Sequence, residues 1–162
     1  MTSMPRRVLF AADLNLPSPR AASHAVHLAA RLKFNLVVMG VSSVLRGRPV
    51  KSGYLEDLPE EQRQWLARVA EQGRREGINP EIFLTRGLFL EEVLSFARSQ
   101  PAIRFIIIGL PDQESGPYLS LNLEALGSLQ KLFEGEVVIV PETGKVMRLE
   151  EYLQEHRPGR EA

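Results

Sequence analysis

Two short runs of the sequence are apolar at every position, and each ends in residues suited to holding a ligand. Val8–Ala12 runs into Asp13, and Phe105–Ile108 runs into Gly109 and a polar loop. A strand with one solvent-exposed face would alternate apolar and polar residues, so continuous runs indicate strands covered on both faces of a parallel sheet. In open α/β sheets, ligands bind beyond the carboxyl ends of the strands, where the strand order reverses. If these strands are neighbours there, Asp13 and the loop after Gly109 face one crevice.

Strand and helix signals alternate along the chain from the first apolar run onward. Ser18 can cap a helix whose first position, Pro19, has no N–H to lose. Pro59 and the acidic residues after it open another helix, and Gly87 leads into the next. Such alternation requires right-handed crossovers, and therefore a parallel sheet with helices on both faces. The expected strands are 8–12, 35–41, 80–85, 105–108 and 136–140, and the expected helices are 19–32, 59–77, 88–99 and 123–133.

The pattern predicts one α/β domain built on a five-stranded parallel sheet of order 3-2-1-4-5. In this order the switch point lies between the first and fourth strands. A chain of 162 residues, 44% of them hydrophobic, can bury a single core. We assign residues 1–141 to this domain and residues 142–162 to a C-terminal tail with a short helix at 148–156 and a charged end. Residues 42–58 form a long connection of the kind that is often functional.

Composition argues against several classes of protein. Twenty basic and twenty acidic side chains cancel, so a strongly basic surface for nucleic acid is not expected. The chain has no cysteine, which excludes disulfides, thiolate metal sites and cysteine nucleophiles. No apolar run approaches the roughly 20 residues that span a bilayer, and nothing resembles a secretory signal. We therefore expect a cytoplasmic protein with neither nucleic acid nor membrane as a partner.

No group of residues forms a recognisable catalytic or metal-binding pattern. His24 and His27 are three residues apart, but no third ligand lies near them in the sequence, so no metal site is expected. The sequence has no G-x-S-x-G elbow, no P-loop and no G-x-G-x-x-G after the first strand. The chain is not expected to be an enzyme, beyond slow incidental hydrolysis of ATP.

Several short motifs follow one another along the chain in a distinctive order and spacing. They are the strand ending in Asp13, the helix start at Ser18, Arg86–Gly87 before a helix, the block 105–109, and Leu126-Gly127-Ser128-Leu129 before the last strand at 137–140. This order and spacing resemble the universal stress protein (UspA-like) family. The resemblance covers residues 6–141, and it implies the adenine nucleotide alpha hydrolase-like fold, a regulatory role in a stress response and a site for ATP or AMP.

The resemblance implies a nucleotide site assembled from three parts of the chain. The adenine and ribose would lie beside Asp13 and the backbone of Val41, while Gly109 and Gly127–Ser128 would hold the phosphates. Glycines let backbone N–H groups approach phosphate oxygens closely, and a helix N-terminus adds a favourable dipole. Structural roles remain open for the same residues, because Asp13 can cap the turn after its strand and Gly127–Ser128 can cap the last helix.

This chain departs from the family motif at its phosphate end. The nucleotide-binding branch has a second glycine three residues after the first, where this chain has Asp112, and Glu114 adds another negative charge. Gly127–Ser128 lies further along the chain than the motif expects, and no lysine or arginine precedes Lys131 in this region. Two functions stay open: a module with a degraded adenine-nucleotide site, or an interaction protein of the same fold that binds an unknown protein partner and no nucleotide.

The last predicted strand suggests a partner. It consists of the apolar residues Val137, Val138, Ile139 and Val140, and it lies at one edge of the inferred order. An exposed apolar edge invites pairing with another chain, and in the resembled family the corresponding strand commonly forms the dimer contact. We expect a homodimer joined through this strand. The alternative is that the tail at 148–156 folds back and covers the edge.

Overall fold

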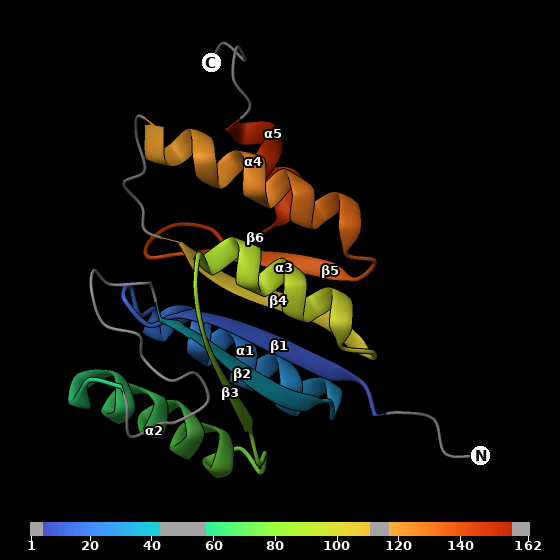
Figure 1. Cartoon of the computed structure of the whole chain (residues 1–162). Helices are drawn as coiled ribbons and strands as arrows, with labels where there is room; N and C mark the ends of the chain where they lie inside the picture. Colours follow the sequence, from blue (N-terminus) through green and yellow to red (C-terminus); the bar gives the residue numbers. More distant parts are fainter. Residues whose placement is uncertain (1–4, 43–57, 111–116, 157–162) are drawn as a thin grey trace.

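The computed structural model describes residues 5–42, 58–110 and 117–156, with the backbone alone described for 117–122. Strands and helices alternate from β1 to β5, as the sequence predicts (Figure 1). The strands are β1 (Arg7–Asp13), β2 (Asn35–Ser42), β3 (Glu81–Arg86), β4 (Ile103–Leu110), β5 (Glu136–Pro141) and β6 (Met147–Arg148). The helices are α1 (Pro19–Leu32), α2 (Glu60–Arg75), α3 (Phe89–Ser99), α4 (Pro117–Leu132) and α5 (Leu149–Glu155).

The strands form a single sheet of order β3-β2-β1-β4-β5-β6. The order predicted for the first five strands is confirmed, and all of them are parallel. β6 is a sixth strand that the sequence did not predict, since two residues carry no detectable periodicity. It runs antiparallel to β5, with Arg148 opposite Val138 and Met147 opposite Ile139. The expectation that β5 forms the edge of the sheet is therefore wrong.

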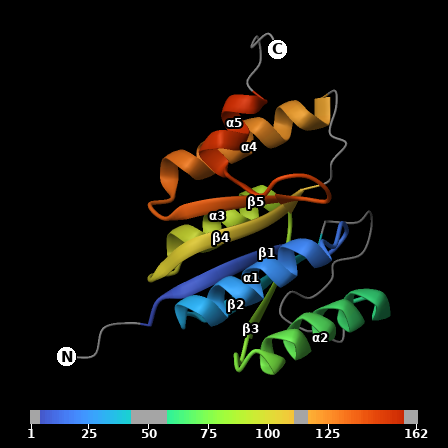
Figure 2. The same cartoon turned by 180° about the vertical axis from the view of Figure 1, so that it is seen from behind.

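Separate apolar cores cover the two faces of the sheet, which explains why the central strands are apolar throughout. On one face, Val8 and Phe10 of β1 pack with α1 and α2. On the other, Leu9 and Ala11 of the same strand pack with α3, α4 and α5. Figures 1 and 2 show these two layers of helices from opposite sides. Trp65 of α2 lies against Phe10 at 5.9 Å between ring centroids, so it serves helix-to-sheet packing.

The start of α1 is held as the sequence predicts. Ser18 adopts an extended conformation, and its side-chain hydroxyl accepts a hydrogen bond of 3.1 Å from the backbone N–H of Ala21. Pro19 occupies the first helical position. At the other end, Lys33 adopts a left-handed conformation with φ of 59° and closes the helix. The N-terminus of α1 follows the carboxyl end of β1 after a loop of residues 14–18, so it lies at the switch point of the sheet.

Candidate functional site

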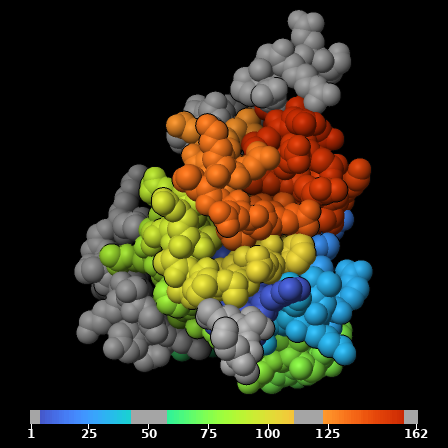
Figure 3. All heavy atoms as spheres, turned by 90° about the vertical axis from the view of Figure 1, so that its right-hand side faces the viewer, coloured from blue at the N-terminus to red at the C-terminus, as the bar shows by residue number. Residues whose placement is uncertain are grey.

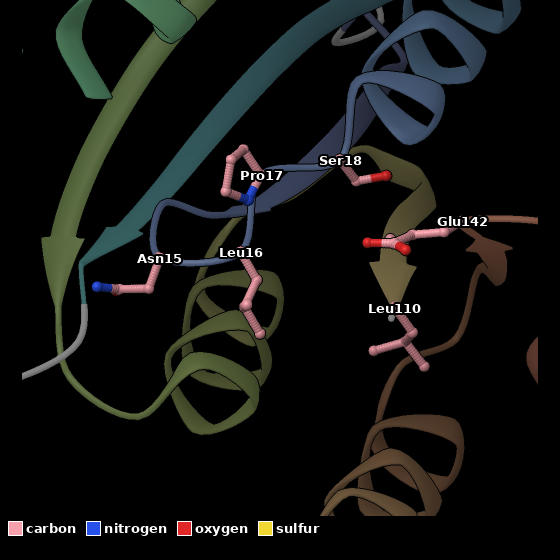
Figure 4. Close-up of a pocket in the computed structure, with 7 residues that line it drawn as sticks. Asn15, Leu16, Pro17, Ser18, Leu110 and Glu142 are labelled. Atoms are coloured by element: carbon pink, nitrogen blue, oxygen red, sulfur yellow. The ribbon is translucent and has the colours of Figure 1, made fainter. Parts of the chain in front are cut away.

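A cavity of about 210 Å³ lies at the carboxyl ends of β1, β4 and β5. It is at the switch point of the sheet, because β1 and β4 are neighbours and their connections lead away in opposite directions. This position matches the crevice expected from the two apolar runs. The lining residues are Asn15, Leu16, Pro17 and Ser18 from the loop after β1, Gly109 and Leu110 from the end of β4, and Glu142 from the turn after β5 (Figure 4).

Asp13 and Val41 lie side by side, as the resemblance implies, but neither lines the cavity. They are register partners in the β1–β2 ladder. The carboxylate of Asp13 accepts a hydrogen bond of 3.0 Å from the backbone N–H of Asn15, which is an Asx turn. The carbonyl of Val41 accepts one of 3.0 Å from the N–H of Leu14. Both residues therefore already serve the turn that leads from β1 into the cavity wall.

The acid strength of Asp13 reflects its position at this turn. Burial raises the pKa of the Asp13 carboxyl from its ordinary value of 3.8, and hydrogen bonds from the backbone of Asn15 and Leu16 oppose this with a smaller lowering effect. A raised pKa means that the folded state holds the proton more tightly than the unfolded chain. The contribution of Asp13 to stability is then greatest below pH 3.8 and declines as the pH rises through the folded-state pKa.

Replacing Asp13 by asparagine is expected to help the fold increasingly as the pH rises. The amide keeps an oxygen that can accept the bond from Asn15 but removes the buried charge. The free energy of unfolding of D13N relative to the natural chain should therefore rise between about pH 3 and pH 7. Urea titrations at several pH values, followed by circular dichroism, measure this difference. A difference that falls over the same range would contradict the raised pKa.

Gly109 lines the cavity because β4 approaches α1 closely at this point. A Cβ atom added to Gly109 would lie 2.5 Å from both Cβ and Oγ of Ser18 and 3.0 Å from Cβ of Ala21. No side chain fits between the strand and the start of the helix. The structure thus explains this glycine by packing, without a phosphate.

Gly127 and Ser128 do not reach the cavity. α4 begins at Pro117, well before the expected start at residue 123, so both residues lie in the second half of this helix. Inside a helix each backbone N–H is directed to the carbonyl four residues earlier. Gly127 and Ser128 therefore lack the position of a phosphate-binding turn, and they do not cap the helix either.

Gly127→Ala is expected to stabilise the protein by about 1 kcal/mol, which is the difference in helix propensity between the two residues. A Cβ atom at Gly127 would meet nothing within 4 Å, so no contact opposes the gain. Thermal and urea unfolding of G127A measure the effect. Destabilisation by G127A would show that the glycine is needed for something other than the helix.

Among the described residues that line the cavity, one side chain is charged, and it is acidic. The side chain of Glu142 extends between Ser18 and Leu110 toward the loop after β1 (Figure 4). Arg20 of α1 fixes the turn that carries it, donating hydrogen bonds of 2.8 Å to the carbonyl of Pro141 and 2.6 Å to that of Gly144. The guanidinium group of Arg20 thus binds the backbone on either side of Glu142.

Sequence reasoning missed Glu142 and Arg20 as parts of this site. The hydrogen bonds from Arg20 to Pro141 and Gly144 join α1 to the turn that carries Glu142, more than a hundred residues later, and no local pattern signals them. The loop after β1 was detectable, since its prolines and Ser18 mark a turn at the expected crevice. Asp112 and Glu114, where the chain departs from the family motif, lie outside the described residues, and so does most of the long connection at 42–58.

Within residues 5–42, 58–110 and 117–156, no three histidine, aspartate or glutamate side chains gather as metal ligands would. His27 faces Glu76 at 3.4 Å, but no further ligand joins them there. In the same described ranges, no helix is both long enough and apolar enough to cross a membrane.

No protein-family model matches the sequence, and no curated protein is similar to it. Solved structures do share its fold. A universal stress protein in complex with cAMP is 16% identical, with a TM-score of 0.59, over 87% of this chain and 100% of that protein. A protein of the universal stress protein family from Burkholderia pseudomallei is 21% identical, with a TM-score of 0.58, over 87% and 99%.

A universal stress protein from Archaeoglobus fulgidus in complex with dAMP is 18% identical, with a TM-score of 0.51, over 86% of this chain and 98% of that protein. At identities this low, the structural similarity shows a common fold alone. The protein thus has the universal stress protein fold, as the sequence resemblance implied, with β6 and α5 continuing beyond the fifth parallel strand.

Proposed function

We propose that this protein is a regulatory binding module of the universal stress protein family, acting in a stress response, and that its cavity takes the adenosine part of an adenine nucleotide. The observation that carries the proposal is the 210 Å³ cavity at the switch point between β1 and β4. Support comes from two proteins of the same fold that were solved with cAMP and with dAMP. Binding rather than catalysis is proposed, since the described lining residues contain no pair of groups suited to acid–base chemistry.

The cavity is poorly equipped for a chain of phosphates. Glu142, which is the one charged side chain among the described lining residues, repels them. The N-terminus of α1 offers few donors, because Pro19 has no N–H and the N–H of Ala21 is bonded to Ser18. We therefore expect adenosine and its monophosphate to bind more tightly than ATP.

A second candidate function is an interaction protein of the same fold that binds no nucleotide. The placement of Gly127 and Ser128 inside α4 favours it, since the motif expected to hold phosphates is then absent from the cavity. In that case the universal stress protein fold would serve recognition of another protein alone.

Calorimetric titration with adenosine, AMP and ATP separates the two functions. Leu16→Trp would fill the cavity from its wall, and Leu132→Trp is a matched control, since both leucines are 49% exposed and Leu132 does not line the cavity. Saturable binding of adenosine and AMP, weakened at least tenfold by L16W and kept by L132W, would support the nucleotide module. If none of the three compounds gave heat at millimolar concentrations, the result would favour the interaction protein that binds no nucleotide.

Glu142→Gln is expected to raise the affinity for AMP by about two- to fivefold, as for an exposed charge near a ligand, and to raise that for ATP more. The glutamine is similar in size but no longer repels phosphate. The affinity for adenosine should change little, and the difference between the nucleotides should shrink in high salt. Glu134→Gln is the control, because Glu134 precedes β5 at the opposite end of the sheet. Unchanged AMP and ATP affinities in E142Q would show that phosphates do not approach Glu142.

A further inference from the structure

The C-terminal strap, which we define as residues 142–155, crosses the outer edge of β5. Its strand β6 places Arg148 opposite Val138 and Met147 opposite Ile139, so the middle of β5 has a backbone partner on both sides. α5 follows immediately and lies beside α4 (Figure 1). The edge that another chain would need for pairing is occupied by the same chain.

The strap is embedded in the apolar cores on both faces of the sheet. Val146, just before β6, packs against the core formed with α1 and α2. Leu149 and Tyr152, just after β6, belong to the core formed with α3 and α4 and are only 2% and 6% exposed. In the space-filling view the red strap and the orange residues of α4 and β5 form one continuous surface (Figure 3). The strap therefore packs on both faces of the sheet at the β5 edge.

Polar contacts also fix the strap, at its start and at β6. Arg20 of α1 binds the carbonyls of Pro141 and Gly144 at the start of the strap. Arg148 lies 3.4 Å from Glu136 of β5, although both side chains are exposed and such a pair contributes little. Most of the holding energy must then come from the buried apolar residues.

We infer that the strap takes the place of a second copy of this chain at the β5 edge. The full chain then does not associate through β5, and pairing between two β5 strands becomes available only when the strap is removed. A second copy would need the same backbone groups and the same apolar surface that the strap already uses. The strap also has the advantage of a short tether, which gives it an effective concentration on the order of millimolar at this edge. This inference replaces the homodimer through β5 that the sequence led us to expect.

A pair of engineered cysteines tests the inference in the full chain. The natural sequence has no cysteine, so V138C/R148C introduces one pair at opposed positions of the antiparallel β5–β6 ladder. Mild oxidation of the purified variant should give an intramolecular disulfide and a monomer band on non-reducing gels. The single variant V138C should form no disulfide between copies, because β6 covers that position. Disulfide-linked dimers of V138C would overturn the inference.

Removal of the strap tests whether β5 then pairs with a second copy. A chain ending at Pro141 should have twice its own mass by light scattering at concentrations where the full chain is monomeric, and V138C should then cross-link between copies. A truncated chain that is folded by circular dichroism and stays monomeric would overturn the inference. If the truncated chain does not fold, the disulfide pattern of the full chain decides. The full chain could have the mass of a dimer and still form the intramolecular disulfide. It would then associate through another surface, with β6 still paired to β5.

Discussion

Gly109→Val is expected to lower the free energy of unfolding by about 3 kcal/mol, as overpacking of a close contact does. The added Cβ alone would lie 2.5 Å from two atoms of Ser18, and the valine methyl groups would extend further toward α1. β4 and the start of α1 would have to separate, which would disturb the cap of that helix and the wall of the cavity. Valine otherwise suits a strand better than glycine, so only this contact can make the change unfavourable.

Urea unfolding of G109V, followed by circular dichroism, measures the loss. The matched control is Gly127→Val, the same substitution at a glycine where a Cβ meets nothing within 4 Å. It is expected to change stability by less than about 0.5 kcal/mol, since valine and glycine differ little in a helix interior. If G109V were as stable as the natural chain, this would contradict the close approach of β4 to Ser18.

Leu149→Ala is expected to cost about 3 kcal/mol, in the range found for buried leucines. Leu149 begins α5 and is 2% exposed, within the core that contains Leu126 and Leu129 of α4 and Ile139 of β5. Truncation would leave a cavity where the strap meets the sheet. A tail that merely followed the domain would show almost no loss on the same change.

The comparison for this variant is Leu32→Ala at the end of α1, where the leucine is 38% exposed. Its loss should stay below about 1 kcal/mol, because alanine is the better helix former and little apolar area is removed. Chemical unfolding monitored by Trp65 fluorescence suits both variants, since this is the one tryptophan of the chain. If L149A and L32A lowered the free energy of unfolding equally, α5 would not be part of the core.

Most of the fold could be predicted from local patterns in the sequence. Continuous apolar runs identified the central strands β1, β2 and β4, because both faces of each of these strands are buried. Caps and helix-compatible prolines placed α1 correctly from residue 19 to 32. The alternation of strands and helices, together with the order common in doubly wound sheets, then predicted the strand order and the end of the sheet where a cavity lies.

The start of α4 shows how a local signal can be misinterpreted. Pro117 suggested a loop, whereas in the structure it occupies the first position of the helix, as Pro19 does in α1. Proline suits both settings, since its fixed φ matches a turn and a first helical turn alike. With the earlier start, Gly127 and Ser128 lie in the second half of the helix and no longer near its start, which removes the basis for their phosphate role.

The sequence by itself determined the order of the elements, the parallel sheet and the position of the crevice. These follow from periodicity and chirality, which are properties of neighbouring residues and of the chain's handedness. Only the tertiary structure decided which groups occupy that crevice and which edge of the sheet is closed. Arg20 holds the turn of Glu142, and Arg148 lies opposite Val138. Such contacts join residues that are distant along the chain, and they arise only once the whole chain has packed, so no local pattern encodes them.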